Sequence, residues 1–259
     1  GREYIKYTGI GTQQVEEQLK LVFPNVRCLR MDMDTTSGKT AHRDILDAFT
    51  RREADVLIGT QMVAKGLDIP NVTLVGVVFA DSTLFHSDFR SSERTFQLLT
   101  QVAGRAGRAD KEGRVVIQTN APGHRAIRLC TKHDYKTFYN LEIGDRLRTL
   151  FPPFAVFVRA QFACADENAA ADAAERFANG VTKTILTALK PANAENELVF
   201  ALAGAAPIRR REGLFRYAVI IKLVRTANTA AAINAIYAFS DGCADECYRG
   251  IEVNPQDML

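Results

Sequence analysis

The sequence has no tryptophan, only four histidines and only five cysteines. An odd number of cysteines, mostly far apart, disfavours a disulfide framework and suits a reducing compartment. No apolar run approaches the roughly 20 residues that a membrane-spanning helix needs. The start of the chain, Gly1–Tyr7, also lacks the charged-then-apolar order of a signal peptide. These absences predict a cytoplasmic protein without a membrane partner.

The metal-ligating residue types are scattered. Cys243 and Cys247 are spaced so that they can share a helix face, but no second ligand pair follows them. The histidines are far from one another: His42, His86, His124 and His133. We therefore expect no metal site on this chain and interpret the cysteines as buried or surface thiols.

The net charge of +3 is small but unevenly distributed. Residues 1–150 contain 22 Lys and Arg against 18 Asp and Glu, and residues 151–259 contain 11 against 12. Within that second part, one basic strip has only Glu212 for a counter-charge; it comprises Arg209, Arg210, Arg211, Arg216, Lys222 and Arg225. A local strip of this kind points to nucleic acid more strongly than the overall charge does.

The first half of the chain alternates short β-branched runs with amphipathic stretches, which predicts an α/β domain with a helix-covered parallel sheet. Strands are expected near Tyr4–Tyr7, Arg27–Met31, Asp55–Ile58, Val72–Val78 and Val115–Gln118. Helices are expected at Gln13–Val22, Thr40–Phe49 and Ser91–Gly104. In the last of these, Phe96, Leu99 and Val102 form one apolar stripe.

A mostly helical segment from about His124 to Leu150 ends at Pro152 and Pro153, which cannot continue a helix. We place the domain boundary there, giving domains 1–150 and 151–259. The second domain is expected as strand 155–163, helix 167–189, strands 198–203 and 215–224, helix 229–239 and strand 250–253. This βαββαβ order predicts a smaller α+β, ferredoxin-like domain.

The segment QVAGRAGR, Gln101 to Arg108, lies at the end of a predicted helix and precedes a glycine-containing turn. Arg105 and Arg108 are separated by small residues, so both guanidinium groups can point into a cleft. An arginine fork suits the charge on a transferring phosphoryl group. The alternative is a basic helix end that interacts with its own macrodipole.

A second polar segment, Gly59 to Asp68, directly follows a predicted strand, where parallel sheets bind ligands. Thr60 and Lys65 suit phosphate contact, Gly66 suits close backbone approach, and Asp68 suits a ribose hydroxyl. The alternative, a polar loop with a helix cap, explains each residue singly but not the ordered set.

The string Thr36-Ser37-Gly38-Lys39-Thr40 resembles a phosphate-binding loop, because it follows a strand and opens a helix. Met33, however, occupies the position of the first glycine of that motif. Its side chain disfavours tight wrapping around phosphate, so we prefer a helix start that a serine or threonine caps.

The segment Pro207–Val224 predicts a basic hairpin with interleaved aromatic residues. Cationic side chains bind phosphate, and aromatic faces stack on unpaired bases. Phe215, Tyr217 and Val219 also alternate as one face of a strand, so we expect at least one of the two aromatic rings to pack in the core. The three arginines, Arg209 to Arg211, are predicted in the turn, where DNA contact competes with a solvated charged loop.

In order and spacing, GTQ…KG.D and Q..GR.GR resemble motifs V and VI of superfamily 2 helicases. The longer string from Phe89 to Arg108 resembles the bacterial replication-restart DNA helicases. Four further segments match that family: Gly11–Leu19, Leu29–Thr36, Phe151–Phe154 and Val253–Leu259.

The resemblance implies an ATP-driven translocase that moves 3′ to 5′ on single-stranded DNA at stalled forks. ATP with Mg²⁺ would lie between a first lobe and this RecA-like second lobe. Arg105 and Arg108 would face the γ-phosphate, with Arg108 as arginine finger, and Gln101 would help to position that end. Gly66 and Asp68 would approach the ribose or couple the nucleotide site to DNA, and Thr60 and Lys65 would face the DNA backbone. The family commonly has a histidine where this chain has Leu67.

The family's Walker A lysine, DEAH-type acidic motif and zinc-binding insert do not occur in this sequence. The chain is therefore expected to be a fragment that is inactive as an ATPase alone. Implied partners are forked DNA, single-stranded DNA-binding protein and the primosome components that load the replicative helicase, at the nucleoid. The alternatives are a binding module for DNA and single-stranded DNA-binding protein without its own activity, and a lobe of another superfamily 2 translocase.

Overall fold

The computed structural model describes residues 11–32, 41–60, 63, 72–86, 88–104, 113–189 and 197–256. The chain divides into two compact units. The first unit contains Gly1–His86 and Arg90–Phe138, and the second contains Ser87–Phe89 and Tyr139–Leu259. Across the described ranges, no helix has the length and apolar character to cross a membrane.

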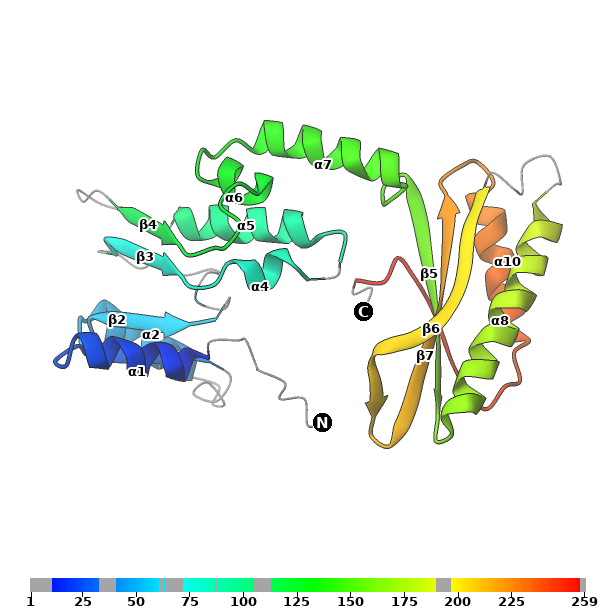
Figure 1. Cartoon of the computed structure of the whole chain (residues 1–259), viewed down its shortest axis with the longest axis horizontal. Coiled ribbons are helices and arrows are strands. Elements are labelled where there is room, and N and C mark those ends of the chain that lie inside the picture. Colours follow the sequence, from blue (N-terminus) through cyan, green and yellow to red (C-terminus); the bar gives the residue numbers. More distant parts are fainter. Residues whose placement is uncertain are drawn as a thin grey trace. The chain divides into compact units, whose positions relative to one another are not determined.

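The first unit alternates strands and helices (Figure 1). Its strands are β1 (Cys28–Met31), β2 (Val56–Gly59), β3 (Leu74–Val77) and β4 (Arg114–Ile117). Its helices are α1 (Thr12–Val22), α2 (Ala41–Thr50), α4 (Asp81–Leu84), α5 (Ser91–Ala103) and α6 (Arg125–Cys130), followed by the start of α7 (Tyr135–Thr149). The strands predicted near 27–31, 55–58, 72–78 and 115–118 and the helices predicted at 13–22, 40–49 and 91–104 are all present, within a few residues of their expected ends.

The strands of the first unit pair in parallel, as their β-branched sequences predict. β1 pairs with β2 and β3 pairs with β4, and both pairs are parallel. We expected one continuous sheet, whereas the described residues form two two-stranded sheets. The segment that leads from β2 to β3 lies largely outside the described residues, and so does the strand predicted at 4–7.

The apolar stripe of α5 is buried as its periodicity predicts. Phe96 and Leu99 are 3% and 1% exposed and form one core with residues of α6 and α7. The rings of Phe96 and Phe138 stack with 4.2 Å between centroids. Val77 of β3 and Ile117 of β4 pack against this core. The core thus holds α5 against the β3–β4 pair.

The predicted helical segment at 124–150 is two helices, because α6 ends in a tight turn. The amide of Asp134 donates to the carbonyl of Leu129, and that of His133 to the carbonyl of Cys130, at 3.0 Å each. This pair of bonds is a Schellman motif, with His133 in the left-handed region at φ 54°. α7 then begins at the side chain of Asp134, which accepts from the amide of Thr137 at 3.0 Å.

The second unit is a four-stranded antiparallel sheet with two helices on one side (Figure 1). Its elements are β5 (Ala155–Cys164), α8 (Glu167–Ala188), β6 (Leu198–Arg211), β7 (Leu214–Val224), α10 (Thr229–Asp241) and β8 (Tyr248–Val253). The strand order is β6-β7-β5-β8. The element order βαββαβ is therefore the one that the sequence predicts.

The core of the second unit lies between the sheet and α8. Asp166 begins α8 by accepting from the amide of Ala169 at 2.8 Å. Every third or fourth residue of α8 is then buried: Ala170, Ala173, Ala174, Phe177, Ala178, Val181 and Ile185. These small residues allow close packing. A Cβ at Gly180 would lie 2.4 Å from Cζ of Phe239, so the α8–α10 contact requires glycine or a shift of that ring.

The opposite face of this sheet is covered by an aromatic cluster. The ring of Phe89 stacks on those of Phe151 and Phe157, with 5.0 and 6.4 Å between centroids. Lys222 is 8% exposed, and its Nζ donates to the carbonyl of Thr149 at 2.9 Å and lies 4.6 Å from the Phe151 centroid. Burial lowers the pKa of Lys222. This cluster places Phe89 in the second unit.

The division between the units does not coincide with the two prolines. α7 ends at Thr149 and β5 begins at Ala155, so the secondary structure changes at Pro152 and Pro153 as expected. The compact units instead divide between Phe138 and Tyr139, because the end of α7 packs with the sheet of the second unit.

All five cysteines are free thiols. Cys243 and Cys247, whose spacing would allow a shared helix face, do not lie on a helix, because α10 ends at Asp241 and both residues follow it. Burial raises the pKa of Cys130 to about 11. Burial and the nearby Cys164 thiol raise the pKa of Cys247 to about 12. These two thiols are therefore protonated and unreactive at neutral pH.

Candidate nucleotide and nucleic-acid site

The first predicted polar segment begins at the carboxyl end of a parallel strand. Gly59 ends β2 opposite Met31, the last residue of β1. A Cβ at Gly59 would lie 2.1 Å from Cγ2 of Val63 and 2.7 Å from the carbonyl oxygen of Met31, so this position requires glycine. The exposed Thr60 follows, and its carbonyl accepts from the amide of Val63 at 3.1 Å. Val63 therefore packs closely against the end of β2.

A polar network at the same strand ends was not singled out from the sequence. Asp32, the residue after β1, is 7% exposed and accepts from the Thr12 hydroxyl at 2.6 Å and from Nε of Arg30 at 3.0 Å. Arg30 also lies 3.7 Å from Glu16 on α1. The network ties the start of α1 to the end of β1. The sequence predicts the start of the helix and the end of the strand. It does not predict the hydrogen bond between Thr12 and Asp32, because these residues are 20 positions apart and meet only in the tertiary fold.

Hydrogen bonds also connect the carboxyl ends of the second strand pair, β3 and β4. Asp81 follows β3 and is 4% exposed. Its carboxylate accepts from the Thr119 hydroxyl at 3.0 Å and from the amide of Asn120 at 2.9 Å, both just after β4. The carboxyl ends of β3 and β4 are therefore held together, at the edge where parallel sheets place their ligands.

The start of QVAGRAGR lies on the last turn of α5, as predicted. Gln101 is exposed, whereas its neighbour Val102 is buried at 9% exposure. Gly104 caps the helix, its amide donating to the carbonyl of Thr100 at 3.1 Å. Five predicted site residues lie outside the described residues: Lys65, Gly66, Asp68, Arg105 and Arg108. The geometry of Gln101 and Thr60 is thus the described part of this site.

The predicted basic hairpin is formed by β6 and β7. Our prediction that Arg209, Arg210 and Arg211 lie in its turn is wrong. The turn residues are Glu212 and Gly213, with φ of 54° and 82°. Two positive φ values in a two-residue loop are typical of a type I′ turn, which favours glycine at its second position. Arg210 and Arg211 pair with Phe215 and Leu214, so the arginines form the end of strand β6.

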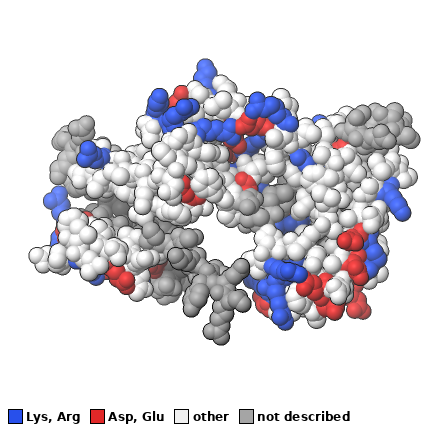
Figure 2. All heavy atoms as spheres, in the orientation of Figure 1, with Lys and Arg blue, Asp and Glu red and all other residues white. Residues whose placement is uncertain are grey.

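The three hairpin arginines each have a local partner. Arg209 is ion-paired with Glu167 at the start of α8. The guanidinium of Arg210 lies 5.0 Å from the Phe215 ring centroid, and Nε of Arg211 lies 3.3 Å from Glu212. The side chains of Arg209 and Arg211 nevertheless stay 64% and 66% exposed. Figure 2 shows basic side chains at this end of the hairpin, beside acidic ones.

The alternation along β7 is as predicted. Tyr217 and Val219 face the helices and belong to the core, and the Tyr217 hydroxyl donates to Glu167 at 3.3 Å. Phe215 is partly covered by Arg210. Arg216, half-buried, lies between them in sequence and therefore on the other face of the sheet. The hairpin thus presents Arg210 and Arg211 more openly than Arg216.

Among the residues that the structure describes, no cluster of three His, Cys, Asp or Glu side chains is placed to hold a metal ion.

The sequence of this chain is similar to those of known proteins. The helicase conserved C-terminal domain family matches residues 6–110, which include the ends of β1, β2 and β3 and Gln101. The chain is 45% identical over 234 residues to the replication restart protein PriA of Bacillus subtilis, covering 90% of this chain and 28% of that protein.

Two further relatives with the same name are similar. PriA of Synechocystis is 50% identical over 155 residues, covering 60% of this chain and 19% of the relative. PriA of Chlamydia pneumoniae is 44% identical over 162 residues, covering 62% and 22%. The chain thus spans 28% or less of the length of these relatives. On these similarities, the chain belongs to the family of the replication restart protein PriA and contains a helicase C-terminal domain.

Proposed function

We propose that this chain is the part of an ATP-dependent 3′ to 5′ DNA helicase that contributes one side of the nucleotide site. The observation that carries the proposal is the placement of two motifs within the helicase match: the GTQ segment follows parallel strand β2, and QVAGRAGR begins at exposed Gln101 on α5. The first unit would be the second RecA-like lobe. The parent would recognise stalled forks and restart replication in the cytoplasm, at the nucleoid.

The roles we assign follow from side-chain chemistry. ATP with Mg²⁺ would lie between this lobe and the first lobe, with Arg108 as arginine finger, Arg105 beside it and Gln101 positioning the γ-phosphate end. Gly66 and Asp68 would approach the ribose, and Thr60 and Lys65 the DNA backbone. Leu67 offers no polar group for coupling these two functions. Zinc would belong to a part of the parent that this sequence does not contain.

The 259-residue chain alone is expected to show no DNA-stimulated ATPase activity. The physical reason is that ATP closes a cleft by giving two lobes a shared anion, and one lobe provides neither a Walker A lysine nor the acidic motif. The measurement is phosphate release by the pure chain with and without forked DNA. DNA-stimulated release at the rate of a typical helicase would contradict the proposal that the chain is only part of the active site.

The second unit, we infer, is a split βαβ, ferredoxin-like domain that holds DNA through the β6–β7 hairpin. Its strand order and the exposed guanidinium groups of Arg209 and Arg211 support this role. We place single-stranded DNA-binding protein and the primosome components that load the replicative helicase among the partners of the parent.

Changing Arg209, Arg210 and Arg211 together to Ala is expected to weaken binding of forked DNA and to flatten its salt dependence. Each arginine that contacts a single-strand phosphate contributes about 0.7 to the slope of log K against log salt. Fluorescence anisotropy at several salt concentrations measures both quantities. As a matched control, Glu167→Gln releases Arg209 from its ion pair and should leave binding unchanged or stronger. An unchanged affinity and salt slope in the triple variant would show that the hairpin does not contact DNA.

A second candidate function is a binding module with no part in catalysis. It is favoured by the compact second unit, whose sheet and helices form a core of their own. The two candidates differ in one outcome: in a binding module, substitutions in QVAGRAGR leave the parent's ATPase activity unaffected.

A further inference from the structure

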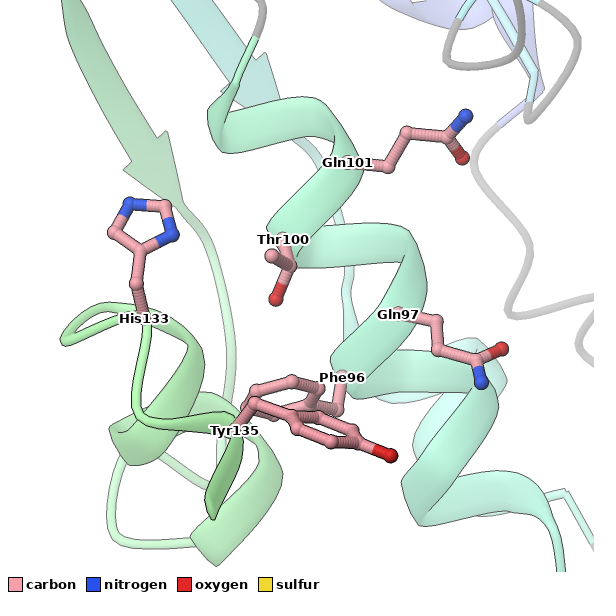
Figure 3. A pocket seen from close by; sticks show the side chains of 6 residues that line it. All are labelled: Phe96, Gln97, Thr100, Gln101, His133 and Tyr135. Carbon is pink, nitrogen blue, oxygen red and sulfur yellow. The ribbon is translucent and has the colours of Figure 1, made fainter. Parts of the chain in front are cut away.

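A cavity of about 430 Å³ lies in the first unit between α5 and the turn that joins α6 to α7. It is lined by Phe96, Gln97, Thr100, Gln101, His133 and Tyr135. In Figure 3, the Thr100 hydroxyl, His133 and the ring of Tyr135 gather on one side of α5, and the two glutamine side chains extend to the other. The cavity therefore offers aromatic rings and hydrogen-bonding groups beside the residue that begins QVAGRAGR.

The aromatic side of this cavity is a platform of two rings. Phe96 is buried, and Tyr135, 61% exposed, lies against it with 6.2 Å between centroids and a tilt of 48°. Tyr135 thus presents a large ring surface to solvent beside the buried ring of Phe96. An aromatic ring held in this way stacks on a planar ligand at little conformational cost.

The polar side contains an unsatisfied group. The hydroxyl oxygen of Thr100 is buried and has no hydrogen-bond partner among the residues that the structure describes. A buried hydroxyl without a partner is destabilising. The exposed imidazole of His133 adds a hydrogen-bonding group to the cavity lining, so the cavity fits a flat ligand with polar edges.

The position of His133 supports a ligand-binding role for the turn. His133 occupies the left-handed position of the Schellman motif, where glycine is the favoured residue. The fold therefore keeps an exposed imidazole at a place where an unsubstituted backbone would be more stable. His133→Gly removes the imidazole and retains the turn.

Positive charge follows the same turn. Arg128, Lys132 and Lys136 are exposed and recur every four residues from α6 into α7. Asp134, the acidic residue among them, caps the start of α7, and the pKa of its carboxyl is lowered by the hydrogen bond from Thr137. On the facing helix, Glu93 accepts from Gln97 at 3.1 Å. Figure 2 shows basic side chains over α6 and the start of α7.

We propose that this cavity takes one unpaired base of single-stranded DNA, which stacks on Tyr135 while Arg128, Lys132 and Lys136 hold neighbouring phosphates. The inference rests on the proposed function, because it assumes a DNA helicase part. It adds a contact on the α6–α7 turn, apart from the motif V residues and from the β6–β7 hairpin. A base in this cavity would touch the helix that ends in QVAGRAGR.

The charge pattern favours a strand over a free nucleotide. Arg128 on α6, Lys132 in the turn and Lys136 on α7 offer three separate cations, which match several phosphates of a polymer, whereas a mononucleotide offers one short phosphate chain. Stacking on an aromatic ring needs an accessible π-face, which duplex DNA does not offer. Single-stranded DNA meets both requirements.

The test uses the 259-residue chain and a single-stranded oligonucleotide that contains 2-aminopurine, whose fluorescence is quenched by stacking. Tyr135→Ala is expected to lose the quenching and to weaken binding by about 5-fold to 100-fold. The double variant Lys132→Gln with Lys136→Gln is expected to reduce the log–log salt slope by about 1.4. His133→Gly should weaken binding while leaving thermal stability equal or higher. Matched controls are Tyr237→Ala on α10 and Lys183→Gln on α8, which are also exposed.

Unchanged quenching and affinity in Tyr135→Ala would overturn the proposal. So would binding of 2-aminopurine deoxynucleoside monophosphate as tightly as the oligonucleotide, since that result assigns the cavity to a free nucleotide. The Arg209–Arg211 variant is titrated in parallel. If it weakens binding and the cavity variants do not, the cavity fails while the proposed DNA-binding function stands. If the unsubstituted chain binds no oligonucleotide, both the cavity proposal and the proposed DNA-binding function fail.

Discussion

In the intact parent helicase, Arg108→Ala is expected to slow DNA-stimulated ATP hydrolysis by about 10³-fold or more. An arginine finger meets charge that develops on the γ-phosphoryl group in the transition state. Its loss therefore lowers the rate of the chemical step and leaves nucleotide binding largely in place. Single-turnover hydrolysis measures the first quantity, and titration with a fluorescent ATP analogue measures the second.

The matched control for this variant is Arg114→Ala. Arg114 is an exposed arginine of the same unit at the first position of β4, and its backbone amide, which the substitution keeps, donates to Thr73 at 2.8 Å. The control should hydrolyse ATP at the parent rate. A loss of nucleotide binding in Arg108→Ala with normal single-turnover hydrolysis would reverse the assignment and make Arg108 a binding residue.

Phe177→Ala is expected to destabilise the second unit by about 3–5 kcal/mol, because it empties the centre of the only large ring cluster on the helix side of its described core. The ring of Phe177 is 3% exposed and lies 5.5 Å from that of Phe162, 5.1 Å from Phe239 and 5.5 Å from Tyr248. Since a whole domain is typically stable by about 5–15 kcal/mol, this loss is a large share of the total.

Urea unfolding followed by far-ultraviolet circular dichroism measures the effect of Phe177→Ala. Tyr237→Ala on α10 removes an aromatic ring that is 43% exposed and should change the free energy of unfolding by about 0.5 kcal/mol or less. Equal effects of the two substitutions would show that the Phe177 ring does not hold the sheet and helices together.

The parts of the fold that depend on local periodicity could be predicted from the sequence. α5 begins and ends within a residue of its expected bounds, because Phe96, Leu99 and Val102 recur at helical spacing and Gly104 follows them. The βαββαβ order of the second unit could be predicted for the same reason, although β6 continues to Arg211, eight residues beyond its expected end at Ala203.

The parts that depend on backbone geometry at single residues were harder to predict. We placed Arg209–Arg211 in the hairpin turn. The turn instead contains Glu212 and Gly213, because a glycine at the second position fits a type I′ turn. Likewise, His133 in the turn after α6 has a conformation usually adopted by glycine, so the sequence contains no conventional sign that the helical segment is two helices.

The residues of the candidate site could be identified from the sequence, but only part of its geometry could be predicted. Gln101 and Thr60 lie where a helix end and a strand end place them. The pairing of Thr12 with Asp32 could not be predicted, because hydrogen bonds between residues 20 positions apart follow from the tertiary fold rather than from any local pattern. The same holds for Arg209 and Glu167, 42 positions apart, whose ion pair leaves less free charge on the hairpin than its sequence indicates.

Phe89 has a consequence for how the protein can be divided. Its ring belongs to the aromatic cluster of the second unit, although the chain on both sides of Ser87–Phe89 belongs to the first. A polypeptide cut after Leu150 would retain Phe89 and lose the rings of Phe151 and Phe157. Its complement would begin with those two rings uncovered and with Lys222 deprived of the Thr149 carbonyl. Neither half made separately is therefore expected to stay monomeric, whereas the two halves mixed in solution should reassemble.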